Sequence, residues 1–161
     1  MRALILTSIL TLTLTAAGCS STVLETPDHF VRLNEGEYSS YKMRATNADG
    51  VVLGVRTIAN DPEGDLGFWT KAVRDRLQTV SGYALLDEQE VTSANGRAGR
   101  RLAFGRDQGS QSYLYWVTLY VSARNLFWPG TITLIEAGGE KEKFQAAESA
   151  VEGALKGAVV D

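Results

Sequence analysis

Cysteine and histidine, the residues that most often carry nucleophilic or metal chemistry, each occur once among the 161 residues of this chain. A single cysteine, Cys19, excludes an internal disulfide and a cysteine zinc site. Nucleophilic catalysis needs a base beside the nucleophile, and nothing in the sequence suggests that His29 folds back to a serine. We therefore interpret His29 as an ordinary residue at the start of a strand. We expect no catalytic residue, no metal site and no cofactor.

Three acidic residues lie close together in the middle of the chain: Asp61, Glu63 and Asp65. Their oxygens could contribute to a Ca²⁺ site, which takes six to eight oxygen ligands. The spacing lacks the remaining ligands and the terminal Glu of an EF-hand. We therefore interpret the segment as a solvated turn, with Asp65 as the N-cap of a helix.

Acidic and basic side chains alternate over residues 87–106. If the strands on either side of Asn95-Gly96 pair as a hairpin, Glu90 lies opposite Arg101 or Arg100. Cross-strand pairs of this kind contribute roughly 0.2–1 kcal/mol each. We favour such a charge ladder over an anion site. Alternation also places neighbouring carboxylates on different faces, so we do not expect a catalytic acid pair among Asp87, Glu88 and Glu90.

Two large aromatic side chains, Phe127 and Trp128, precede the Pro129-Gly130 break. Such a cluster could be an exposed patch that binds a protein partner. The same residues could instead cover the open end of a sheet. Both interpretations remain open from the sequence, and we carry Phe127, Trp128 and Pro129 forward as a candidate partner-binding patch.

The overall composition is that of one folded globular domain, with 44% hydrophobic and 22% charged residues. The formal net charge is −3 and the isoelectric point is near 5.2, which argues against a nucleic-acid partner. The glycines lack the spacing of a phosphate-binding loop.

The first 18 residues have the marks of an export signal. Arg2 gives a weakly positive start, residues 3–14 are mostly apolar, and small residues follow. A membrane-spanning helix needs about 20 apolar residues, so this segment is too short to be one. Its removal takes away Arg2 alone among the charged residues and lowers the formal net charge from −3 to −4.

The sequence Leu14-Thr15-Ala16-Ala17-Gly18-Cys19 resembles the lipobox of bacterial lipoproteins, with Ala16 where that family most often has leucine. The resemblance implies diacylglycerol on the Cys19 thiol, cleavage before Cys19, and often a further acyl chain, such as palmitate, on the new amino group. Two or three acyl chains anchor a protein stably. Ser20, rather than an aspartate, follows the cysteine, which by resemblance to enterobacterial sorting favours the outer membrane over the inner one.

The rest of the chain is divided into a tether, residues 19–28, and a single domain, residues 29–161. Short runs rich in branched and aromatic residues predict strands, and Asp49-Gly50 and Asn95-Gly96 predict hairpin turns. The predicted strands span 30–33, 38–47, 51–59, 83–94, 97–106, 113–121 and 127–137. We expect Gly138-Gly139 to end the sheet.

Apolar residues at steps of three and four predict two helices. The first begins after Asp65, ends near Gly82 as its C′ residue, and buries Leu66, Trp69, Val73, Leu77 and Val80. The second spans 140–159 and buries Phe144, Ala147, Val151, Ala154, Leu155 and Ala158. The order β-β-β-α-β-β-β-β-α predicts an α+β fold, an antiparallel sheet flanked by helices.

The helix that leads through Val80-Ser81-Gly82-Tyr83 into Leu85-Leu86 is followed by Val91, Asn95-Gly96, Gly99-Arg100-Arg101 and Phe104. With the aromatic strand 113–121, Ile135-Glu136-Ala137-Gly138 and the last helix, this pattern resembles the Mog–PsbP-type fold. That superfamily includes a Ran-binding nuclear import factor, an extrinsic photosystem protein and bacterial lipoproteins. The resemblance implies a binding or assembly role without catalysis, and no functional residue carries over.

These observations predict a non-enzymatic lipoprotein of the bacterial envelope. We expect it to be anchored through Cys19, to face the periplasm and to bind a protein partner. One alternative is a small-ligand-binding or enzymatic domain whose site is built from scattered carboxylates and arginines. A further alternative is a soluble secreted protein.

Overall fold

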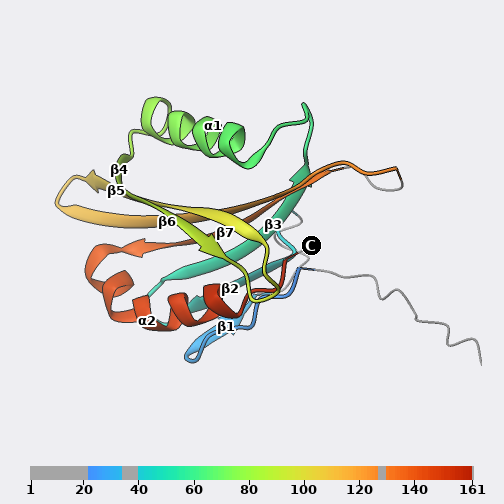
Figure 1. Cartoon of the computed structure of the whole chain (residues 1–161). Helices are drawn as coiled ribbons and strands as arrows, with labels where there is room; N and C mark the ends of the chain where they lie inside the picture. The colour runs from blue at the N-terminus through green and yellow to red at the C-terminus, as the bar shows by residue number, and fades with distance from the viewer. Residues whose placement is uncertain (1–21, 34–39, 127–129, 161) are drawn as a thin grey trace, which may run out of the picture.

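The computed structural model describes residues 22–33, 40–126 and 130–160. Within them the chain forms seven strands and two helices in the predicted order (Figure 1). The elements are β1 (Phe30–Arg32), β2 (Met43–Asn47), β3 (Val52–Ala59), α1 (Leu66–Thr79), β4 (Ala84–Thr92), β5 (Ala98–Gln108), β6 (Gln111–Ser122), β7 (Thr131–Glu140) and α2 (Lys141–Gly157).

The strands form one antiparallel sheet in the order β1-β2-β3-β7-β6-β5-β4. The last strand in sequence, β7, lies between β3 and β6 and joins the two halves of the sheet. Helix α1 lies on one face and α2 on the other (Figure 1). The α+β fold with an antiparallel sheet flanked by helices is therefore confirmed.

Both predicted hairpin turns are present. Gly50 has a φ of 81° and Gly96 a φ of 84°, in the left-handed region that glycine adopts without strain. The turn at Gly96 is closed by hydrogen bonds between the backbones of Ser93 and Arg97 and of Gly96 and Ser93. This turn sets the pairing of β4 with β5, in which Glu90 lies opposite Arg100.

Helix α1 begins as predicted, because the Asp65 carboxylate accepts a hydrogen bond of 2.7 Å from the Phe68 amide. Its end differs from the prediction. The C-cap is Val80, which is 71% exposed rather than part of the buried stripe. Gly82 has a φ of 68° but lies two residues beyond that cap.

Strand β7 continues through the two glycines that were expected to end it. Gly138 pairs with Val52 and with Tyr115, and helix α2 starts at Lys141. A Cβ on Gly138 would lie 3.3 Å from the Tyr115 ring, and one on Gly139 would lie 3.1 Å from Val51. The glycines therefore permit close packing within the sheet, and the prediction that they end it is wrong.

The start of the described chain is joined to its end. Val23 forms an antiparallel bridge with Val159, with N–O distances of 2.9 and 3.0 Å. Leu24 is 7% exposed and belongs to the core on the α2 face. Part of the segment expected to be a tether is therefore packed against the domain, because Leu24 removes apolar surface from water there.

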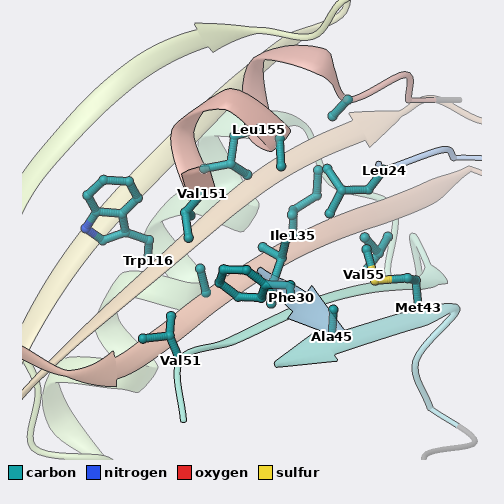
Figure 2. Close-up of a cluster of buried hydrophobic side chains, with 14 of the residues drawn as sticks. Leu24, Phe30, Met43, Ala45, Val51, Val55, Trp116, Ile135, Val151 and Leu155 are labelled. Atoms are coloured by element: carbon teal, nitrogen blue, oxygen red, sulfur yellow. The ribbon is translucent and has the colours of Figure 1, made fainter. Parts of the chain in front are cut away.

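Two apolar cores lie on the two faces of the sheet. In the core on the α2 face, Val151 of α2 lies near Trp116 and Ile135 of the sheet and near Val51, which directly precedes β3 (Figure 2). Phe144 of α2 belongs to the same core. The core on the α1 face is built mainly from buried strand residues, including Leu102, Phe104 and Leu119. The apolar stripe of α1 packs on it while staying partly exposed.

Candidate functional site

Four residues proposed from the sequence to have functional roles lie outside the described residues. These are the lipidation residue Cys19 and the candidate patch Phe127, Trp128 and Pro129. The residues on either side of the candidate patch are described. Leu126 precedes the patch and is 91% exposed, whereas Gly130 follows it and is buried.

The adjacent arginines Arg100 and Arg101 lie on opposite faces of β5. Arg100 faces α1, where its guanidinium lies 3.2 Å from Glu90 and 3.7 Å from Glu88. Arg74 of α1 adds a 2.9 Å contact to Glu88. This arrangement confirms the predicted charge ladder for Arg100.

Arg101 has a different environment, beneath α2. Its side chain is 13% exposed, and its guanidinium lies 4.5 Å from the centre of the Trp116 ring. It donates a 2.8 Å hydrogen bond to Gln89 and makes a longer contact, 3.4 Å, with Glu152 of α2. Arg101 is thus almost buried, while its carboxylate partner lies beyond the ordinary distance of a strong ion-pair hydrogen bond.

A cavity of about 240 Å³ opens beside this arginine, between β4–β6 and the C-terminal half of α2. Polar groups converge on it from three strands and the helix. The residues that line it are Gln89, Val91, Thr92, Arg101, Thr118, Tyr120, Glu152, Leu155 and Lys156.

Thr118 is the least satisfied polar residue of that lining. It is 2% exposed, and its hydroxyl has no hydrogen-bond partner among the described residues. Leaving a buried hydroxyl unpaired costs about 1–3 kcal/mol. Next along the same face, Tyr120 has its pKa raised by burial, an effect that Arg101 partly offsets. The cavity therefore combines a nearly buried cation, an unpaired hydroxyl and apolar walls.

A second polar cluster lies on the α1 face of the sheet. Glu136 of β7 is 8% exposed, accepts a 2.7 Å hydrogen bond from Arg56 of β3, and accepts another from the Tyr115 hydroxyl. Its second carboxylate oxygen has no partner among the described residues. Burial and the neighbouring Glu136 charge raise the pKa of Tyr115 well above its usual value of 10.0. The cluster joins β3, β7 and β6 across the middle of the sheet.

Asp65, in the acidic turn before α1, has a structural contact. Asp65 caps the helix, and the nearby Asn60 side chain holds the loop through 2.9 Å hydrogen bonds with the Gly64 backbone. His29 is exposed at the start of β1, with a φ of 64°. In the described part of the chain, no three acidic, cysteine or histidine side chains gather as a metal site would require.

Sequence patterns alone did not single out Thr118, Arg56 or Glu136. The available signal was a charged or polar residue inside an otherwise apolar strand, at Arg56, Thr118 and Glu136 in turn. That signal indicates a buried polar group without indicating its partner, since Arg56 and Glu136 are 80 residues apart.

Comparison with protein-family models and with curated proteins found no match. Among solved structures, the fold is similar to that of LpqN of Mycobacterium tuberculosis, a protein involved in cell envelope biogenesis, with a TM-score of 0.69. The similarity covers 86% of this chain and 82% of LpqN at 11% sequence identity. At this identity the likeness shows a shared fold, while the lipobox and the Mog–PsbP resemblance stay predictions from the sequence.

Within the described residues, neither helix has the length and apolar character needed to cross a membrane.

Proposed function

We propose that this chain is a lipid-anchored protein of the bacterial envelope whose α+β domain binds a protein partner without catalysing a reaction. The observation that carries the proposal is the position of its one cysteine, directly after Ala16, Ala17 and Gly18 at the end of a short apolar segment. The structural likeness to LpqN, a protein of envelope biogenesis, agrees with an envelope role.

The packing of the N-terminal segment supports a short connection between lipid and domain. Four residue steps separate Cys19 from Val23, which is paired with Val159. An extended chain spans at most about 3.3–3.6 Å per residue, so these steps reach no further than about 14 Å. An acylated Cys19 would hold the corner formed by Val23 and Val159 next to the bilayer.

The use of the charged groups supports a role without catalysis. Asp65 caps a helix, and Glu88 and Glu90 lie in the ladder with Arg100. His29 is exposed at the start of an edge strand. A general base needs a reacting group within hydrogen-bond reach, and these side chains are committed to structure or stand apart.

The exposure of the residue directly before positions 127–129 supports the partner-binding half of the proposal. Leu126 is 91% exposed directly before Phe127, Trp128 and Pro129. Large aromatic residues are enriched among those that dominate binding energy at protein interfaces. We therefore propose this segment as the partner-binding patch.

The anchoring half is tested with Cys19→Ser. We expect this variant to lose palmitate labelling and to leave the membrane fraction, while the unaltered chain retains both. Ser21→Ala, two residues away, is the matched control and should remain in the membrane fraction. If the Cys19→Ser variant still labels and still pellets with membranes, the anchoring proposal is wrong.

Two further measurements separate the alternatives. The mass of the mature N-terminus distinguishes a diacylglyceryl cysteine from the free end of a soluble secreted protein. Separation of inner and outer membranes tests the outer-membrane assignment, which depends on Ser20. We expect Ser20→Asp to move the protein to the inner membrane if that sorting rule holds.

The patch is tested by crosslinking in cells with Trp128→Ala. We expect loss of the crosslinked partner, because a large aromatic anchor is removed. Val80→Ala serves as control, since Val80 is 71% exposed and is far from residue 128 in the chain. Equal crosslinking by both variants and the unaltered chain would exclude the patch.

A further inference from the structure

The cavity beneath α2 has a charge balance that favours an anion. Arg101 and Lys156 contribute two positive charges to its lining, against one negative charge from Glu152. Glu152 divides its contacts between the two cations, at 3.4 Å from Arg101 and 3.6 Å from Lys156. Neither distance is that of a tight ion pair, so a better-placed carboxylate can compete with Glu152 for the Arg101 guanidinium.

The guanidinium is held in place before any ligand binds. The Trp116 ring lies 4.5 Å from it, and Gln89 accepts a 2.8 Å hydrogen bond from one of its nitrogens. Trp116 is itself packed edge-to-face on Phe144, with the ring centres 5.0 Å apart. A cation fixed in this way loses little conformational entropy on binding, which favours affinity.

The rest of the cavity suits a short apolar chain. Val91 and Leu155 supply aliphatic walls, and the Tyr120 ring supplies an aromatic one. A volume of about 240 Å³ lies below the roughly 300–1,000 Å³ of pockets for drug-sized molecules. Thr118, at the β6 side of the cavity, has a buried hydroxyl without a partner among the described residues. An incoming acceptor oxygen would satisfy that hydroxyl.

We propose that this cavity binds a small amphipathic monocarboxylate. Its carboxylate pairs with Arg101 and accepts a hydrogen bond from Thr118, and its short hydrocarbon chain lies against Val91, Tyr120 and Leu155. Glu152 is displaced toward Lys156. This binding site is independent of the anchoring and partner-binding roles proposed above.

The test uses three probes with the same chain and different head groups: hexanoate, 1-hexanol and hexylamine. Calorimetric titration of the full chain should show binding of hexanoate and at least roughly tenfold weaker binding of the other two, because only a carboxylate forms a charge-assisted hydrogen bond with the Arg101 guanidinium. Equal binding of hexanol, or failure of hexanoate to bind, overturns the proposal.

Variants then locate the site. Arg101→Gln should weaken hexanoate binding at least about tenfold, whereas the matched variant Arg100→Gln should leave it unchanged, since Arg100 faces the other side of the sheet. Thr118→Val, which replaces the hydroxyl with a methyl group of similar size, should weaken binding several-fold. Equal effects of Arg100→Gln and Arg101→Gln would place binding elsewhere.

Glu152→Gln gives a result that misfolding cannot imitate. Removing the competing carboxylate should strengthen hexanoate binding several-fold, because Arg101 no longer has an internal anionic partner. Weaker binding in this variant would mean that Glu152 holds the ligand, which contradicts a carboxylate ligand.

Discussion

The two faces of the sheet bury their helices to different depths. On the α2 face, Phe144 and Val151 are 0% exposed, and the chain start adds Leu24 to the same core. On the α1 face, the strands are well buried, but Thr70 is the one residue of α1 that is buried. Leu66, Trp69, Val73 and Leu77 stay partly exposed. The apolar area removed from water sets the stabilisation, so α2 should contribute more than α1.

The faces also differ in how they use charge. The α1 face holds the ladder around Arg100 and the cluster around Glu136, in which charged groups pair with one another. On the α2 face, Arg101 lies nearly buried beside a cavity, and the carboxylate it contacts among the described residues, Glu152, is 3.4 Å away. The two adjacent arginines thus differ. Arg100 is paired with carboxylates on the α1 face, whereas Arg101 borders a cavity on the α2 face and has the geometry of a binding site.

The largest expected effect comes from emptying the α2 core. Phe144→Ala should lower the free energy of unfolding by about 3–5 kcal/mol, because it removes a fully buried ring and leaves a cavity. Leu77→Ala, in the partly exposed stripe of α1, should lower it by about 1–2 kcal/mol. Denaturant unfolding measures both. Equal losses would mean that the two helices contribute alike.

The Glu136 cluster should make stability depend on alkaline pH. The pKa of Tyr115 is raised above 10.0 by burial and by Glu136. Above pH 10 the unfolded chain therefore loses this phenolic proton while the folded chain keeps it, and stability falls as pH rises. Tyr41 and Tyr120, whose pKa values are also raised by burial, act in the same direction.

Tyr115→Phe isolates this effect. At pH 7 the variant should be less stable by about 1–2 kcal/mol, because Glu136 loses a hydrogen-bond donor. Above pH 10 the difference from the unaltered chain should shrink, since the variant has one fewer proton to lose. Urea unfolding at pH 7 and pH 11 checks this expectation, and a constant difference between the two pH values would contradict it.

A smaller effect is expected at the start of α1. Asp65→Ala removes the carboxylate that accepts the 2.7 Å hydrogen bond from the Phe68 amide, and should lower stability by about 1 kcal/mol. Asp65→Asn should retain most of the stability, since asparagine caps helices as well. Hydrogen exchange should report the loss in α1 rather than in α2. Loss of protection in both helices would contradict the expectation that the effect is confined to α1.

The smallest effect is expected from the charge ladder. Arg100→Gln should change the free energy of unfolding by less than about 1 kcal/mol, because its partner Glu90 is 83% exposed and the pairs are screened by solvent. Thermal unfolding at low and high salt should show the difference shrinking as salt rises. A large, salt-independent loss would indicate that the ladder is part of the core.

Much of the fold was predictable because its signals are local. The steps of three and four from Leu66 to Leu77 require only a helix with one apolar face, and Asp65 needs only the next turn to act as a cap. The turn at Asn95-Gly96 was equally clear, since glycine adopts a positive φ readily. The segment at Gly138-Gly139 misled because glycine often ends a strand, whereas here it lets Tyr115 and Val51 approach β7 closely.

The candidate site was harder to predict because its contacts are not local. The sequence left open whether Glu90 lies opposite Arg100 or Arg101. The structure pairs Glu90 with Arg100, and strand alternation places Arg101 on the other face. Thr118 and Glu152 meet near Arg101 only because β6 and α2 pack there. The unpaired hydroxyl of Thr118 exists only in the folded chain.

The sequence by itself determined the order and type of the elements, because these depend on periodicity and turn residues. It also carries the predicted export signal and lipidation residue, because these depend on a short contiguous motif. Only the tertiary structure decided that β7 lies between β3 and β6, that Glu136 meets Arg56, and that Arg101 borders a cavity. These outcomes depend on which apolar faces pack together, and the partners are separated by as many as 80 residues of chain. No local pattern specifies such a pairing.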